Sequence, residues 1–111
     1  MDFDEYQKLA SRTGDFSSRT KEYTLMYLSM GLAGETGEVI EKLKKVIRND
    51  NGEISPEKHE DLKREIGDVL WYASQLALHL DMTFNDVAQT NITKLADRAA
   101  RNVIVSEGDT R

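Results

Sequence analysis

The sequence predicts an all-α fold of four helices. Apolar residues recur at three- and four-residue intervals along most of the chain, which is the spacing of one face of a helix. The chain has a single Pro and many Glu, Lys, Leu and Ala residues, which favour helices. Its 111 residues are expected to form one domain over residues 1–101, with an aperiodic tail over residues 102–111. A domain this small buries a modest core, so we expect a partner subunit to complete the bundle.

Periodicity and turn-forming residues delimit the first two helices. The first is expected to run from Phe3 to about Thr13, and a linker rich in Gly and Ser follows over residues 14–20. The second helix is expected to end near Arg48, before the turn-forming cluster at residues 49–52. The residues predicted to form its apolar face are Leu25, Leu28, Leu32, Val39, Leu43 and Val46.

The third helix begins with a strong start signal. Ser55 is a typical N-cap residue, and Pro56 suits the first helical position because its fixed backbone angle matches the helix. The helix is expected to continue to about Leu80. Its predicted apolar face consists of Leu62, Ile66, Val69, Leu70, Ala73, Ala77 and Leu80.

A capping signal and a polar stripe mark the fourth helix. Thr83 and Asp86 resemble a capping box, and the helix is expected to run through about Arg101. Three side chains on it share one face at helical spacing and suit phosphate oxygens or a nucleotide, although a solvated face is an equal alternative. They are Asn91, Lys94 and Arg98.

Composition excludes several functional classes. The net charge of −5 and the pI near 5.0 argue against a nucleic-acid-binding surface, which needs clustered Lys and Arg. The chain has no Cys, so it forms neither disulfides nor a zinc–thiolate site. Residues 1–5 are acidic and do not resemble a signal peptide, and no apolar run approaches the roughly 20 residues that cross a bilayer. We therefore expect a cytoplasmic protein that binds neither nucleic acid nor membrane.

Two pairs of carboxylates indicate a metal site: Glu35 with Glu38, and Glu65 with Asp68. Residues three apart share one helix face, so each pair can direct both carboxylates toward one point. Glu35 falls within the apolar stripe of its helix, where a carboxylate needs a proton, a basic partner or a metal ion. Mg²⁺ prefers oxygen ligands and often takes some of them from substrate phosphates. The pattern therefore favours chemistry on a phosphate.

Simpler interpretations exist for these acids and for their neighbours. One pair alone is more typical of a solvated face or of a salt bridge to Lys42 or Lys45, but two pairs favour the metal site. The second helix also contains a Gly at positions 31, 34 and 37, each costing about 1 kcal/mol relative to Ala. They indicate either close helix approach or access to the backbone beside the acids. Trp71 is interpreted as a dimer contact or as a surface for base stacking.

Three segments resemble MazG-type nucleoside triphosphate pyrophosphohydrolases of the all-α NTP pyrophosphatase superfamily. They are residues 31–42 (GLAGETGEVIEK), residues 65–72 (EIGDVLWY) and residues 91–98 (NITKLADR). The family pattern is E-E-x-x-E followed by E-x-x-D, and here Gly34 occupies the first Glu position. The resemblance covers nearly the whole chain and implies a MazG-like helical bundle assembled as a homodimer or as a dimer of dimers.

The resemblance also implies an activity and roles for residues. It implies Mg²⁺-dependent cleavage of (d)NTP at the α-phosphorus to (d)NMP and pyrophosphate in nucleotide-pool housekeeping, with Mn²⁺ as an alternative ion. The implied metal ligands are Glu35, Glu38, Glu65 and Asp68, with Glu35 or Glu38 also taking the proton of the attacking water. The implied substrate contacts are Lys94 and Arg98 to phosphates and Asn91 to the nucleotide.

Two other functions fit the same sequence. One is a different member of the superfamily, such as a dUTP diphosphatase or a phosphoribosyl-ATP pyrophosphohydrolase, which a panel of substrates distinguishes. The other is a helical oligomerisation module without enzymatic activity. Divalent ions would leave the melting temperature of such a module unchanged, whereas ligand binding raises the melting temperature of a metal-binding enzyme.

Overall fold

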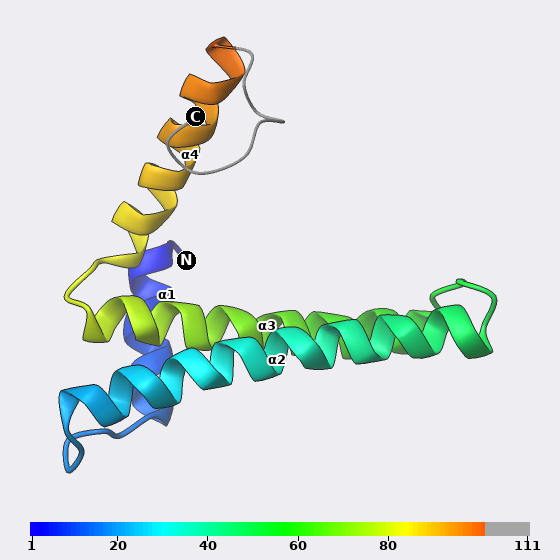
Figure 1. Ribbon diagram of the computed structural model, residues 1–111, viewed down its shortest axis with the longest axis horizontal. Coiled ribbons are helices and arrows are strands. Elements are labelled where there is room, and N and C mark those ends of the chain that lie inside the picture. Colours follow the sequence, from blue (N-terminus) through cyan, green and yellow to red (C-terminus); the bar gives the residue numbers. More distant parts are fainter. Residues whose placement is uncertain (102–111) are drawn as a thin grey trace.

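The computed structural model describes residues 1–101, which form helices and no strand (Figure 1). The predicted all-α class and all four predicted helices are confirmed. The predicted tail of residues 102–111 lies outside the described residues. The elements are α1 (Phe3–Ala10) with the 3-10 turn η1 (Ser11–Thr13), α2 (Lys21–Asn49), α3 (Pro56–His79) and α4 (Phe84–Ala100).

Side-chain caps fix where the helices begin. The hydroxyl of Ser55 accepts a hydrogen bond from the backbone N–H three residues later, at the start of α3. Thr83 does the same at the start of α4, and Thr20 at the start of α2. Each cap satisfies a backbone donor that has no partner inside the helix and typically stabilises it by about 1 kcal/mol. The predicted starts at Ser55 and Thr83 are therefore confirmed.

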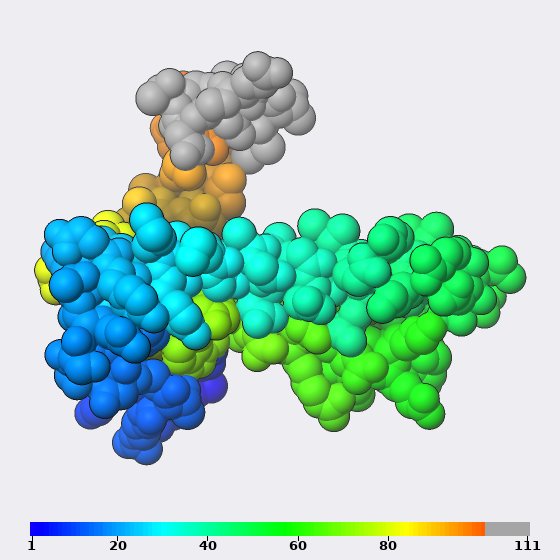
Figure 2. Space-filling model, turned by 60° about the horizontal axis from the view of Figure 1, so that its bottom comes forward, coloured from blue at the N-terminus to red at the C-terminus, as the bar shows by residue number. Residues whose placement is uncertain are grey.

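A long hairpin dominates the architecture. Figure 1 shows α2 and α3 lying side by side, while α1 crosses one end of the pair and α4 projects away from that same end. The chain reverses between α2 and α3 at the predicted turn, where Asn51 and Gly52 have positive φ angles of 55° and 79°. Asn and Gly tolerate this left-handed backbone. Figure 2 shows the turn end of the hairpin extending well beyond the other described helices.

The buried side chain of Gln7 joins α1 to the ends of α3 and α4. Its amide nitrogen donates to the carbonyl oxygens of Ser74 and Met82, both at 3.0 Å. Its amide oxygen accepts from the backbone N–H of Phe84 at 3.2 Å. A buried amide with its donors and acceptor satisfied holds its surroundings in one arrangement. Gln7 thus sets the direction in which α4 leaves the body of the fold.

The core of a single chain is small. The radius of gyration is 16.9 Å, against about 13 Å for a compact domain of this length. Leu43, Ile66 and Leu80 were assigned to the predicted apolar faces, but they are 38%, 56% and 41% exposed. They are therefore not core residues of the single chain, because no described part of the same chain covers these side chains. The buried apolar residues are Ala10, Leu28, Val46, Leu62, Ala77 and Phe84.

A second apolar face on α2 was missed in the sequence. At 100° per residue, the side chains of this face lie roughly 100° to 200° around the helix from Leu28 and Val46. A helix that is apolar on two faces is typically covered on both sides. The exposed residues of this second face, called here the outer stripe, are Met26, Met30, Ile40 and Ile47.

None of the helices in residues 1–101 is long and apolar enough to cross a membrane.

Candidate functional site

Three of the predicted acidic residues meet between α2 and α3. Glu35 comes from α2, and Glu65 and Asp68 come from adjacent turns of α3. One carboxylate oxygen from each lies within 4.8 Å of the others. Glu35 and Glu65 are half-buried and Asp68 is exposed. The packing of the two long helices therefore places three of the four carboxylates of the two motifs around one point.

The fourth predicted acid occupies a different position. Glu38 lies one turn beyond Glu35 on α2, and its side chain is exposed. It does not belong to the group of three carboxylates found among residues 1–101. Its charge nevertheless reaches the cluster, since it is one of the groups that raise the pKa of Glu35. Its assignment as a metal ligand remains a prediction.

Burial and repulsion act together on Glu35. Partial burial raises the pKa of this carboxyl, and the negative charges of Asp68 and Glu65 raise the pKa further. A side-chain hydrogen bond between Glu35 and Glu65 acts in the same direction, because the two oxygens share a proton. The cluster therefore holds more negative charge than its surroundings favour. A hard divalent cation that prefers carboxylate oxygens, such as Mg²⁺ or Mn²⁺, fits this donor set.

A lysine lies at the edge of the cluster. Nζ of Lys42 is 3.6 Å from Oε1 of Glu65, across the interface between α2 and α3. A salt bridge from Lys42 to one of the acidic pairs was one of the simpler interpretations, and Lys42 does contact Glu65 in this way. A partly exposed pair of this kind contributes about 1 kcal/mol or less to stability. The contact is therefore weak enough to be exchanged for a stronger one.

A cleft of about 330 Å³ opens beside the carboxylates, lined by Thr13, Glu35, Asp68, Trp71 and Tyr72. The indole N–H of Trp71 donates to the hydroxyl of Thr13 at 2.9 Å and to a carbonyl at the end of α1 at 3.1 Å. These contacts hold Trp71 inside its own chain, a role that neither sequence interpretation included. Acidic and aromatic side chains thus share one concave surface, as in many ligand sites.

The ring of Tyr72 forms one wall of this cleft. It lies edge-on to the ring of Trp71 at 5.0 Å and near that of Tyr27 at 6.5 Å. Burial, a hydrogen bond with Tyr27 and the charges of Glu35 and Asp68 raise the pKa of Tyr72. The phenol therefore stays protonated at neutral pH.

One of the three glycines in α2 makes room for Tyr72. A Cβ atom on Gly31 would lie 2.1 Å from the Tyr72 ring, so the predicted close approach is confirmed at this position. At Gly34 and Gly37, a Cβ atom would meet no described atom within 4 Å. Access to the backbone beside the acids, the alternative interpretation, fits these two positions.

The predicted phosphate-binding stripe lies elsewhere. Asn91 is exposed, Lys94 is half-buried and Arg98 is buried, and all three belong to α4. Figure 1 shows α4 projecting away from the hairpin, and α4 packs on α1 and α3. A single chain therefore does not bring these residues to the carboxylates. Their assigned roles remain predictions.

Two residues that line the cleft, Tyr72 and Thr13, were given no role from the sequence. Tyr72 had a usable signal, because it follows Asp68 by four residues on the same helix face. Thr13 had none, since it reaches the cleft only through the way η1 packs near α3.

Two comparisons with known proteins identify the family of this chain. The family model of the MazG nucleotide pyrophosphohydrolase domain matches residues 23–102, which include the acidic cluster and most of the described helices. The Gene 37 protein of Mycobacterium phage L5 is 44% identical over 117 aligned positions, covering both chains completely. No solved structure gives a significant match. From the family match and from this relative, the chain belongs to the MazG nucleotide pyrophosphohydrolase family.

Proposed function

We propose that this protein hydrolyses nucleoside triphosphates at the α-phosphorus in a reaction that depends on Mg²⁺, releasing a nucleoside monophosphate and pyrophosphate. Either (d)NTP class serves as substrate, and the biological role is nucleotide-pool housekeeping. The observation that carries the proposal is the meeting of Glu35, Glu65 and Asp68 beside a cleft. Membership of a pyrophosphohydrolase family supports the choice of reaction.

The chain's own carboxylates supply the binding groups. Glu35, Glu65 and Asp68 hold the ion, and Mn²⁺ serves in place of Mg²⁺ because both accept oxygen ligands. When bound, the ion supplies Lewis-acid activation of the attacking water and neutralises phosphate charge. Glu38, which is exposed one turn from Glu35 on α2, acts as a further ligand, and either Glu38 or Glu35 accepts the proton of the water.

The aromatic side of the cleft serves the nucleotide. A volume of about 330 Å³ falls within the range of small-molecule sites, which begins at roughly 300 Å³. Trp71 is fixed by two hydrogen bonds, so its ring is held in place before any ligand binds. Aromatic faces stack on every base with little selectivity. We assign the base of the substrate to the ring of Trp71 and its phosphates to the acidic side.

A second copy of the chain completes the site. The phosphate-binding stripe of α4 (Asn91, Lys94 and Arg98) is remote from the carboxylates of its own chain, so a partner's α4 supplies those contacts. The outer stripe of α2 and the large radius of gyration support an assembly that covers the hairpin. A homodimer, or a dimer of such dimers, meets this requirement.

The test measures hydrolysis of the common ribo- and deoxyribonucleoside triphosphates, with Mg²⁺ and with a chelator, while resolving pyrophosphate from orthophosphate. Asp68→Asn removes one carboxylate of the cluster without changing its shape. Glu41→Gln is the matched control, because Glu41 pairs with Lys44 at 3.0 Å on α2. Metal-dependent release of monophosphate and pyrophosphate, lost in Asp68→Asn and kept in Glu41→Gln, is the expected result. Equal activity of the two variants contradicts the proposed site.

The other functions appear as outcomes of the same experiment. The substrate panel includes dUTP and phosphoribosyl-ATP, and turnover of only one of these assigns the chain to that specialised activity. If no substrate is hydrolysed and divalent ions leave the melting temperature unchanged, the chain is a helical oligomerisation module. The outer stripe of α2 is the feature that favours such a module.

A further inference from the structure

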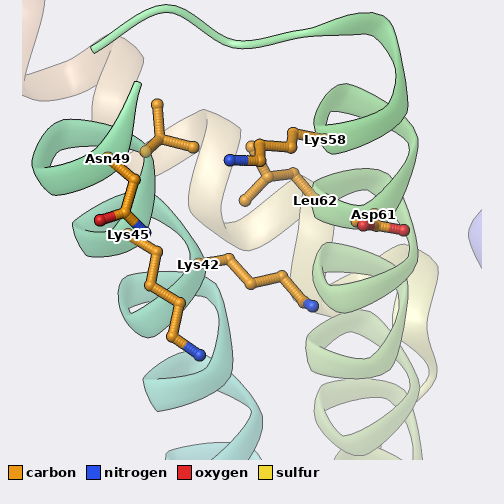
Figure 3. A pocket seen from close by; sticks show the side chains of 7 residues that line it. Lys42, Lys45, Asn49, Lys58, Asp61 and Leu62 are labelled. Carbon is orange, nitrogen blue, oxygen red and sulfur yellow. The ribbon is translucent and has the colours of Figure 1, made fainter. Parts of the chain in front are cut away.

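A second, smaller cavity lies between α2 and α3 on the turn side of the hairpin, adjoining the acidic cluster through Lys42. Its volume is about 170 Å³. Figure 3 shows the Lys42 side chain crossing from α2 toward α3 within this cavity. Val46 and Leu62 are buried and give the cavity an apolar floor. The other lining residues are Lys45, Asn49, Lys58 and Asp61.

Lys42 connects this cavity to the carboxylates. Its ammonium lies 3.6 Å from Oε1 of Glu65, and Glu65 contributes an oxygen to the acidic cluster. Lys42 also follows Glu35 by seven residues and Glu38 by four on α2, which places the three side chains along one side of the helix. Lys42 is thus the basic residue that directly contacts a carboxylate of the cluster in residues 1–101.

The other lysines of the cavity point to different partners. Lys45 pairs with Glu41 at 3.8 Å, outside the cluster. Lys58 pairs with Asp50 near the turn. Their charges therefore serve local contacts on the hairpin, while the charge of Lys42 acts on the site.

We propose that Lys42 is a displaceable counter-ion that becomes a phosphate-binding residue. In the metal-free protein its ammonium neutralises Glu65. When Glu65 coordinates a divalent ion, Lys42 leaves that carboxylate and contacts the phosphates of the nucleotide beside the cluster. This inference rests on the proposed function and adds a residue that the sequence analysis did not assign to substrate binding.

Physical chemistry supports such an exchange. The side chain of Lys42 is 37% exposed, so its contact with Glu65 is screened and easily lost. Its long stem is flexible, and the apolar floor formed by Val46 and Leu62 supports the methylene groups while the charged end moves. An ammonium binds phosphate as a point charge, without the strict geometry that an Arg fork requires. Lys42 therefore loses little at Glu65 and gains a stronger anionic partner.

The test compares Lys42→Met, Lys42→Arg and Lys45→Met in the full chain. Calorimetric titration with Mn²⁺ alone measures metal affinity, and steady-state kinetics with the preferred triphosphate measures KM and kcat. Without the competing ammonium, Lys42→Met is expected to bind Mn²⁺ about two- to fivefold more tightly. Without the phosphate contact, its KM is expected to rise about tenfold.

The two other variants separate charge from structure. Lys42→Arg keeps the charge, so its Mn²⁺ affinity is expected to remain within about twofold of the wild-type protein, and its KM is expected to rise less than that of Lys42→Met. Lys45→Met loses a charge in the same cavity and is expected to change neither. Circular dichroism melting confirms that each variant is folded. A general structural effect would move metal affinity and substrate affinity in the same direction.

The outcomes distinguish this inference from the proposed function. If wild-type protein hydrolyses triphosphates but Lys42→Met keeps its Mn²⁺ affinity or its KM, the role of Lys42 is overturned and the function stands. If wild-type protein binds Mn²⁺ without any turnover, the metal titration decides alone, and an unchanged dissociation constant in Lys42→Met overturns the inference. If wild-type protein binds no Mn²⁺, the proposed metal site and this inference both fall.

Discussion

The ring of Tyr72 packs so closely on Gly31 that a Cβ atom at residue 31 would lie 2.1 Å from Cε1 of the ring. Tyr72 also lines the cleft together with Glu35 and Asp68. Because Gly31 has no side chain, α3 packs close to α2 at this point. This close packing brings the carboxylates of α3 near Glu35 of α2. Packing between the two helices and the geometry of the site depend on the same contact.

Gly31→Ala is accordingly expected to destabilise the protein. Overpacking costs typically about 1–3 kcal/mol, and the better helix propensity of Ala returns about 1 kcal/mol of this. Urea denaturation without metal measures the difference in unfolding free energy. Gly34→Ala is the control, since a Cβ atom there meets no described atom within 4 Å, and it is expected to stabilise by up to about 1 kcal/mol. Equal effects at the two positions would show that the Tyr72 contact does not restrict residue 31.

The raised pKa of Glu35 predicts how the stability of the metal-free protein depends on pH. Partial burial and the nearby Asp68 and Glu65 make the folded state hold the proton more tightly than the unfolded state does. The resulting stabilisation is complete below the ordinary pKa of the carboxyl, and it is lost as the pH rises through the raised pKa. Metal-free wild-type protein should therefore lose stability over this range.

Glu35→Gln isolates this contribution, because its amide does not titrate. Melting temperatures of both proteins, measured with a chelator at a series of pH values, are expected to diverge as the pH rises, with the variant the more stable above the raised pKa. Adding Mg²⁺ at neutral pH should raise the melting temperature of the wild-type protein alone. Parallel pH curves would mean that Glu35 ionises without cost in the folded protein.

Local signals account for most of what the sequence predicted. Ser55 and Thr83 cap their helices through residues three positions away, and a signal of this range is readable from sequence. The contact of Trp71 with Thr13 spans 58 positions, so no local pattern announces it. Ile66 was misassigned for a related reason: helical spacing identifies an apolar face but does not say which chain covers it.

In the candidate site, too, some features follow from local sequence patterns and others only from the tertiary structure. Spacing put Glu65 and Asp68 on one face of α3, and only the packing of α2 on α3 adds Glu35 to them. Lys42 could be read as a salt-bridge partner, but its place in a cavity between α2 and α3, in contact with Glu65 of the acidic cluster, depends on the tertiary structure. The direction of α4 depends on the buried Gln7, which carries no sequence signal for such a role.

Glu38→Gln tests the predicted ligand that lies outside the cluster. We expect it to lower kcat by about a hundredfold or more, because its loss removes a proton acceptor, without lowering the melting temperature of the metal-free protein, because Glu38 is exposed and its charge repels Glu35. Initial rates at saturating Mg²⁺ and triphosphate provide the measurement. A fully active variant would restrict the metal site to Glu35, Glu65 and Asp68.

The separation of α4 from the carboxylates predicts that two defective chains restore one another. Lys94→Ala should raise KM by removing a phosphate contact, and Asp68→Asn should remove a metal ligand. If a partner's α4 completes each site, a mixed dimer of the two variants contains one site with an intact Asp68 from one chain and an intact Lys94 from the other. The second site of that dimer carries both defects.

Co-expression of the two variants, at substrate concentrations below the wild-type KM, is therefore expected to recover about a quarter of wild-type activity, since random pairing makes half of the dimers mixed and each has one intact site. Each variant expressed alone provides the baseline, and light scattering after size-exclusion chromatography verifies the dimer. If α4 served its own chain's site, every site in the mixture would carry one defect, and the activity would equal the average of the two variants. Recovery above that average thus requires that Lys94 and Asp68 of the same site belong to different subunits.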